Sequence, residues 1–132
     1  MLTRLPLLLL FCSSAAVAAE QPGPPLSELM AQPAYVTAWK TMLGPDLVPD
    51  WVKSYAETLD GPPTPSIKVP VSGDTYTLGF TCKAQDCGGN QLYVLFAPQA
   101  KRAWGLLITG ESHRWFGHPE PPIQQAILGR VE

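Results

Sequence analysis

The chain is poor in charge, in histidine and in cysteine, and these shortages exclude several classes of function. Of its 132 residues, 9 are lysine or arginine, 11 are aspartate or glutamate, 2 are histidine and 3 are cysteine. The formal net charge of −2 argues against a nucleic-acid partner, which needs clustered basic side chains, and is compatible with a cationic protein partner. No long apolar run follows the first residues, so we expect no membrane span in the mature chain.

The motifs of common hydrolases and nucleotide-binding proteins are missing as well. The sequence has no Gly-x-Ser-x-Gly, no His-Glu-x-x-His and no glycine-rich phosphate loop. Asp46, Asp50, Glu57 and Asp60 are spread through a helical, proline-broken region, as solvated surface charges are. We therefore expect a protein that is not an enzyme and that binds neither a cofactor nor a metal.

The N-terminal segment has the order of a secretory signal. Arg4 supplies the positive charge, Leu5 to Phe11 form a short apolar core, and Ala16-Val17-Ala18 matches a small-x-small cleavage site. We expect cleavage to remove residues 1–19 and to leave residues 20–132 as one exported domain, located in the periplasm.

Cleavage also changes the cysteine count and the net charge. Cys12 leaves with the signal; a lipid anchor at Cys12 is the alternative, but Phe11 precedes it where lipid attachment needs a small residue. Cys82 and Cys87 remain, and an even pair in an exported chain favours a disulfide. Loss of Arg4 leaves 8 basic against 11 acidic side chains, a net charge near −3.

The hydrophobic pattern changes its period along the chain and predicts an α+β domain. Helical spacing begins near Leu26, restarts at Pro33 and, after a turn, continues to Leu59. Alternating or apolar segments then predict strands at 67–71, 76–82, 91–97 and 104–108, followed by a short helix that stops at Gly129. Pro70 places the first strand at an edge. We expect a central antiparallel sheet with helices packed on it.

The segment from Cys82 to Cys87 forms a loop between two of these strands, at one end of the sheet. In the chain-entropy model so small a ring stabilises the fold by only about 2 kcal/mol, so the bridge serves mainly to stiffen what it encloses. Lys83 is a donor, Asp86 an acceptor and Gln85 both. These residues suit a recognition loop, and an ordinary stapled hairpin with solvated side chains is the alternative. The spacing differs from the Cys-x-x-Cys of thiol oxidoreductases.

A histidine-based enzyme or metal site is a further alternative. Cys82, Cys87, His113 and His118 include the ligand types of zinc sites, but the gap from Cys87 to His113 is longer than in zinc fingers. We expect His113 and His118 to lie in a loop, with His118 before Pro119 as a turn residue.

Three pieces of the sequence carry a resemblance to a known family. They are Leu47–Val52 after an early helix, Gly73–Tyr76, and the Cys-Lys-x-x-Asp-Cys-Gly loop Cys82–Gly88 before an apolar strand. Over about residues 36–107 the chain resembles the Ivy family, the inhibitors of vertebrate lysozyme. The resemblance implies an α+β fold with a rigid disulfide loop that inserts into the active-site cleft of c-type lysozymes.

The resemblance also implies roles for the loop residues. The Cys82–Cys87 disulfide would hold the loop rigid, and the target-binding residues would be Lys83, Ala84, Gln85 and Asp86. The family has a histidine at the key position where this chain has Gln85, which can donate hydrogen bonds but cannot become cationic. A lytic transglycosylase is therefore an alternative partner to c-type lysozyme. Because some relatives dimerise, the resemblance also implies that a homodimer can form.

Overall fold

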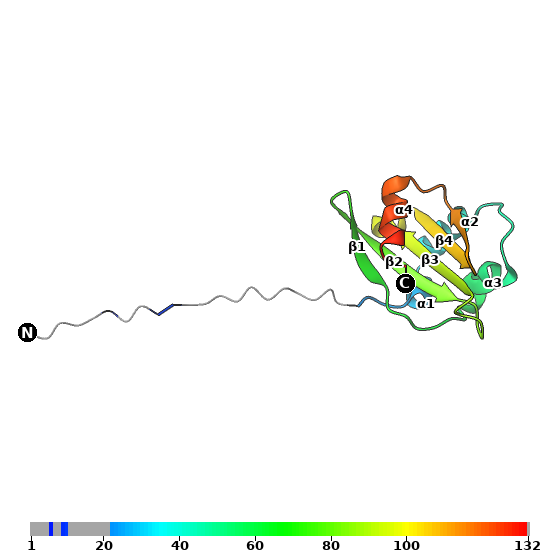
Figure 1. Cartoon of the computed structure of the whole chain (residues 1–132), viewed down its shortest axis with the longest axis horizontal. Helices are drawn as coiled ribbons and strands as arrows, with labels where there is room; N and C mark the ends of the chain where they lie inside the picture. The colour runs from blue at the N-terminus through cyan, green and yellow to red at the C-terminus, as the bar shows by residue number, and fades with distance from the viewer. Residues whose placement is uncertain (1–5, 7–8, 11–21, 132) are drawn as a thin grey trace, which may run out of the picture.

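The structure is a computed structural model that describes residues 6, 9–10 and 22–131 (Figure 1). The predicted cleavage site and Cys12 lie outside the described residues, so the export signal and the boundary at residue 19 stay predictions. Within the described ranges, every helix is too short or too polar to cross a membrane.

Three helices come first, as the sequence predicts. They are α1 (Leu26–Leu29), α2 (Pro33–Leu43) and α3 (Asp50–Thr58). Pro33 occupies the first turn of α2, where its missing N–H is not needed. Gly44 ends α2 with a φ of +53°, and its N–H donates to the carbonyl oxygen of Lys40 at 2.9 Å. Glycine reaches this backbone conformation without the penalty that a Cβ brings.

An antiparallel sheet follows, with its strands in chain order from β1 to β5. The strands are β1 (Ile67–Val71), β2 (Asp74–Cys82), β3 (Asn90–Phe96), β4 (Ala103–Thr109) and β5 (Ser112–Phe116), with a short 3₁₀ turn, η1 (Pro98–Ala100), before β4. Pro70 lies on edge strand β1, where its missing N–H does not interrupt a central ladder. A closing helix, α4 (Pro121–Leu128), completes the predicted α+β fold.

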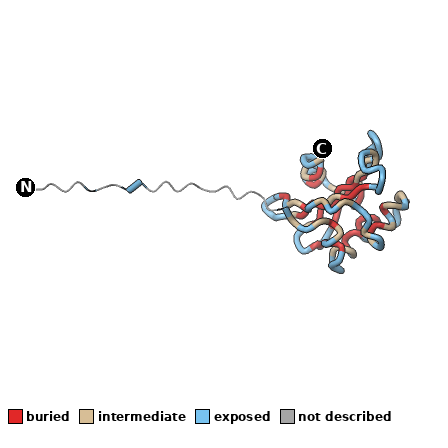
Figure 2. Tube along the Cα trace, turned by 90° about the horizontal axis from the view of Figure 1, so that it is seen from below, coloured by how far each residue is buried: buried red, intermediate tan, exposed pale blue. Residues whose placement is uncertain are grey.

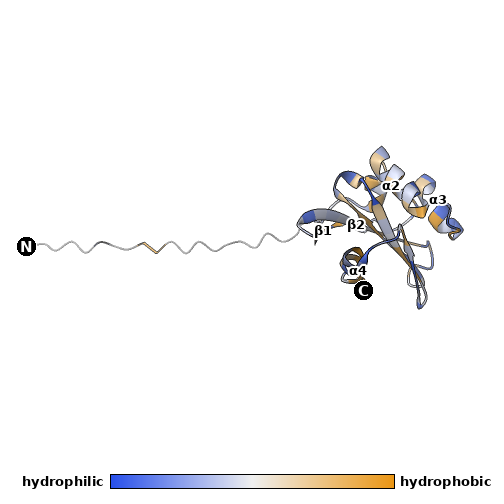
Figure 3. Cartoon of the chain, turned by 90° about the horizontal axis from the view of Figure 1, so that it is seen from above, coloured by the Kyte–Doolittle hydropathy of each residue, from blue (hydrophilic) through white to orange (hydrophobic). Residues whose placement is uncertain are grey.

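Both faces of the sheet are covered. Helices α2 and α3 lie on one side and α4 on the other, as the edge-on view of Figure 3 shows. The core under α1–α3 includes Trp39, Phe96 and Phe116, and the core under α4 includes Leu95 and Ile127. Buried residues lie in the interior of the domain and exposed residues at its periphery (Figure 2). The runs of buried residues in β3 and β4 confirm that these strands are covered on both sides.

Strand β5 corrects the prediction that His113 lies in a loop. His113 pairs with Ile108 within the β4–β5 ladder. The first residues of β5, from Ser112 to Arg114, are all exposed and polar, so they lack the alternation that marks a half-buried strand. Strand β5 is an edge strand, and both of its faces are uncovered at this end, because successive side chains point to opposite faces and all three are exposed.

The strand ends place two connections next to each other. The β2–β3 connection, residues 83–89, carries the predicted recognition loop, and the β4–β5 turn, residues 110–111, lies at the same end of the sheet because Asn90 pairs with Thr109. The N–H of Gly110 donates to the carbonyl oxygen of Gly89 at 2.9 Å. The predicted position of the loop at a sheet end is thus confirmed.

Candidate functional site

The disulfide between Cys82 and Cys87 is formed, with the two Cα atoms 4.9 Å apart. Its two ends differ in their surroundings. Cys82 is the last residue of β2 and is only 3% exposed, whereas Cys87 and the residues between them are exposed. The bridge therefore ties a solvent-facing loop to a cysteine that is itself fixed in the sheet.

A tight turn forms the tip of this loop. The N–H of Asp86 donates to the carbonyl oxygen of Lys83 at 3.1 Å, so Ala84 and Gln85 occupy the two central positions of the turn. Gln85 has a φ of +67°. A positive φ at the third position of a four-residue turn is the pattern of a type II turn. All four residues that the sequence predicts as target-binding thus lie in one exposed turn, with Gln85 near its apex.

The carboxylate of Asp86 is turned back toward the base of the loop. Asn90 Nδ2 donates to Asp86 Oδ2 at 2.8 Å. The other oxygen, Oδ1, lies so close to Gly89 that a Cβ there would be 2.9 Å from it. The backbone of Asn90 also contributes, because its carbonyl oxygen accepts the N–H of Lys83 at 3.1 Å. Asp86 thus has partners within the loop and its adjoining strand.

Sequence reasoning missed Asn90. The predicted strand begins at residue 91, whereas Asn90 is the first residue of β3. A polar amide four positions after Asp86 is the signal that was available. The signal is weak, because contact between these side chains depends on the path of the two glycines between them.

Helix α3 lies beside the loop, across a groove. Trp51, Ser54 and Thr58 of α3 line a groove of about 200 Å³ together with Lys83 and Ala84. The disulfide and the hydrogen bond between Gly110 and Gly89 thus anchor the base of the loop, α3 lies across the groove from it, and its tip is exposed. Such an arrangement can enter a concave surface on a partner without reorganising itself.

The sequence of this chain is similar to that of known proteins over most of its length. The sequence profile of a family described as Inhibitor of vertebrate lysozyme (Ivy) matches residues 34–127. The chain belongs to the Ivy family. A Pseudomonas aeruginosa protein named Inhibitor of vertebrate lysozyme is 32% identical over 132 residues, which cover 89% of this chain and 82% of that protein.

Two further relatives carry no functional name. A second Pseudomonas aeruginosa protein, described as uncharacterized, is 34% identical over 131 residues, covering 87% of this chain and 82% of its own. A Yersinia pestis protein, also described as uncharacterized, is 28% identical over 137 residues, which cover 91% of this chain and 86% of that protein. The membership that the resemblance implied is therefore confirmed, and it extends over most of the chain.

The structure does not bring together the residues of the alternative metal site in this Ivy-family chain. Cys82 and Cys87 use their sulfur atoms in the disulfide. His113 lies within β5, and His118 lies beyond the end of that strand at Phe116. Among the described residues, no three histidine, cysteine, aspartate or glutamate side chains lie close enough together to hold a metal ion. The zinc alternative therefore lacks its predicted ligand set.

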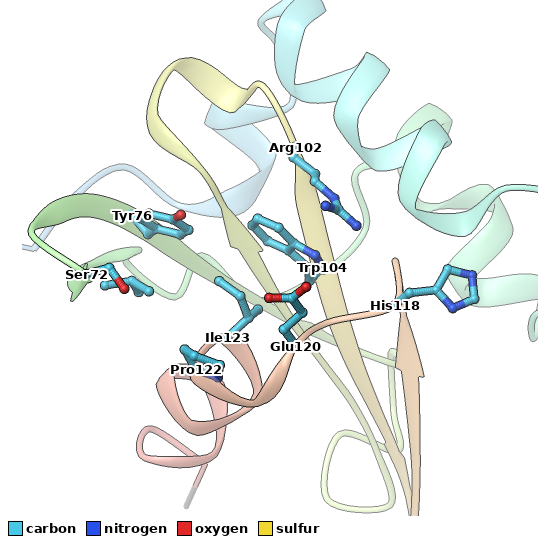
Figure 4. Close-up of a pocket in the computed structure, with 9 residues that line it drawn as sticks. Ser72, Tyr76, Arg102, Trp104, His118, Glu120, Pro122 and Ile123 are labelled. Carbon is cyan, nitrogen blue, oxygen red and sulfur yellow. The ribbon is translucent and has the colours of Figure 1, made fainter.

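A second cavity, of about 290 Å³, lies at the other end of the sheet from the disulfide loop (Figure 4). Tyr76 and Trp104 stack in its wall with ring centroids 6.0 Å apart. The guanidinium of Arg102 lies 4.9 Å from the centroid of the Trp104 ring and donates to the carbonyl oxygen of Gly117 at 3.0 Å. The His118 imidazole points away from the other labelled side chains, so this Ivy-family pocket does not place it as a base beside a nucleophile.

Proposed function

We propose that the mature chain is a periplasmic protein inhibitor that binds c-type lysozyme by inserting the loop from Lys83 to Asp86 into the active-site cleft. The observation that carries this proposal is the exposed turn held by the Cys82–Cys87 bridge in a member of the Ivy family. The relative named Inhibitor of vertebrate lysozyme supports the choice of target.

A stiff loop suits insertion into a cleft. Each flexible residue that becomes fixed on binding costs about 1–2 kcal/mol of backbone entropy, and a loop already fixed in its bound shape avoids much of that cost. The bridge and the turn hydrogen bond between Lys83 and Asp86 provide this preorganisation.

The donors at the tip match the chemistry of the proposed target. Lysozyme catalysis uses two carboxyl groups that flank the scissile bond. The amide of Gln85 can donate two hydrogen bonds to such oxygens, and the ammonium of Lys83 supplies a charged donor. A loop that binds between the two carboxyl groups blocks the substrate sterically, so the inhibitor itself needs no catalytic group.

The direct test is a titration of residues 20–132 against a c-type lysozyme acting on cell-wall substrate. We expect inhibition that saturates at one inhibitor per enzyme and is overcome by excess substrate. Absence of both inhibition and binding at micromolar concentrations would contradict the proposal.

A lytic transglycosylase is a second candidate target, and Gln85 is the observation that favours it. A neutral amide forms weaker hydrogen bonds to carboxylates than a cationic histidine does, about 1 kcal/mol against 1.5–3 kcal/mol. The same titration against a purified lytic transglycosylase decides between the two, because the true target is the enzyme that binds more tightly.

Sedimentation of the free protein tests the further proposal of a homodimer.

Electrostatic attraction gives a prediction for the salt dependence of binding. The mature chain carries a net charge near −3, from 8 basic and 11 acidic side chains, and Glu111 is exposed in the turn beside the loop. With a basic lysozyme, we expect the association rate to fall several-fold between about 50 and 200 mM salt. The dissociation rate should change little. Stopped-flow measurements at both salt concentrations check this, and an association rate that rises with salt would contradict it.

Export gives a prediction about the N-terminus. We expect the protein purified from the periplasmic fraction of its host to begin at or next to Glu20, because Ala16-Val17-Ala18 directs cleavage there. Mass spectrometry of the intact protein measures this directly. Recovery of the full-length chain from the cytoplasmic fraction would contradict both the cleavage and the location.

A further inference from the structure

We propose that Asp86 and Asn90 act as a positioning pair for the recognition loop, and that the Asp86 carboxylate does not itself bind the target. This inference rests on the proposed function and deepens it, because it separates the residues that touch the target from those that hold the loop.

The two contacts of the Asp86 carboxylate lie toward the base of the loop. Asn90 Nδ2 donates to Oδ2 at 2.8 Å, and Oδ1 lies against Gly89, whose missing Cβ leaves room for it. Gly89 is in turn held through its carbonyl oxygen by the N–H of Gly110. The carboxylate thus connects the turn at the tip to β3, while the backbone of Gly89 connects the loop to the β4–β5 turn.

Charge gives an independent reason for this orientation. A cleft that holds two carboxyl groups repels a third carboxylate, and the repulsion grows as water is excluded. Asp86 is next to Gln85 in the sequence, so a freely rotating carboxylate could point into the cleft. The hydrogen bond from Asn90 keeps the negative charge at the base of the loop and leaves Lys83, Ala84 and Gln85 at the surface that enters.

An exchange of the two side chains tests this role. Asn90→Ala removes the donor, and we expect the inhibition constant for c-type lysozyme to rise about threefold to tenfold. Asn90→Asp should be at least as weak, because two carboxylates then face each other. The double variant Asp86→Asn/Asn90→Asp restores a charge-assisted hydrogen bond with donor and acceptor exchanged. We expect it to return to within about twofold of the natural protein.

The alternative makes the opposite prediction. If the Asp86 carboxylate binds the target directly, Asp86→Asn alone lowers inhibition and the double variant stays as weak. That result would overturn the proposal. All variants should unfold at the same denaturant concentration as the natural protein within error, because the pair is exposed.

Two glycines provide a matched control. Gly89→Ala places a Cβ 2.9 Å from Asp86 Oδ1 and must displace the carboxylate, whereas a Cβ on Gly88 meets no described atom within 4 Å. We expect Gly89→Ala to weaken inhibition about as much as Asn90→Ala does, and Gly88→Ala to leave it unchanged. Equal inhibition by the two glycine variants would contradict the positioning role.

Hydrogen exchange separates failure of this inference from failure of the proposed function. In the free protein, the backbone amide of Asp86 donates within the turn and should exchange faster in Asn90→Ala, with recovery in the double variant. This readout needs no lysozyme. Unchanged exchange would overturn the pair even if the protein inhibits lysozyme. If the Asp86 amide exchanges faster in Asn90→Ala but the protein does not inhibit lysozyme, the positioning role of Asp86 and Asn90 stands. The proposed target, c-type lysozyme, is then refuted.

Discussion

Replacing both bridge cysteines, Cys82→Ala/Cys87→Ala, is expected to weaken lysozyme inhibition by about tenfold or more while leaving the protein folded. Without the bridge, the four residues from Lys83 to Asp86 must be ordered on binding. Fixing a single residue costs about 1–2 kcal/mol, and about 1.4 kcal/mol corresponds to tenfold in affinity.

The stability of the variant separates a loop effect from unfolding. The chain-entropy model assigns about 2 kcal/mol to so small a ring, out of the roughly 5–15 kcal/mol that holds a typical domain folded. Denaturant unfolding and inhibition should therefore be measured on the same preparation. A variant that unfolds at a slightly lower denaturant concentration but inhibits as well as the natural protein would show that the disulfide has no part in recognition.

Gln85→His is expected to strengthen inhibition of c-type lysozyme by about tenfold. A charged donor to a carboxylate is worth about 1.5–3 kcal/mol, against about 1 kcal/mol for a neutral one. The backbone accepts the change, because Gln85 has a φ of +67° and histidine is among the residues enriched in the left-handed region. The gain should be larger at pH 6 than at pH 8, since an unperturbed imidazole has a pKa of about 6.5 and is cationic only below it.

Two other substitutions at this position control for that result. Gln85→Glu places an anion at the tip and should abolish most of the inhibition, whereas Gln85→Gly keeps the backbone conformation and removes the amide. If the histidine, glutamate and glycine variants all inhibit equally, the tip of the loop does not lie in the cleft.

Much of the fold follows from patterns that depend on local burial. The apolar runs of β3 and β4 predict central strands, because only a strand covered on both faces can bury every side chain. Pro70 marks an edge for a different reason, since it lacks the N–H that a central ladder needs. Pro33 and Gly44 likewise delimit α2 through backbone geometry alone.

The parts that sequence reasoning missed depend on contacts between separate segments. Strand β5 begins with exposed polar residues, and it is a strand because β4 offers it a free edge. The hydrogen bond between Asn90 and Asp86 depends on how Gly88 and Gly89 reverse the chain, which composition does not specify. The positions of Lys83, Ala84 and Gln85 were predictable as a loop, whereas the inward orientation of Asp86 was not.

The most direct test of loop insertion is competition for the lysozyme cleft. Binding of residues 20–132 to a c-type lysozyme can be measured by titration calorimetry with the cleft empty and with it filled by a soluble chito-oligosaccharide. Insertion of the loop predicts that the apparent Kd rises in proportion to the oligosaccharide concentration, because the two ligands exclude each other. An unchanged Kd, with all three components in one complex, would contradict it.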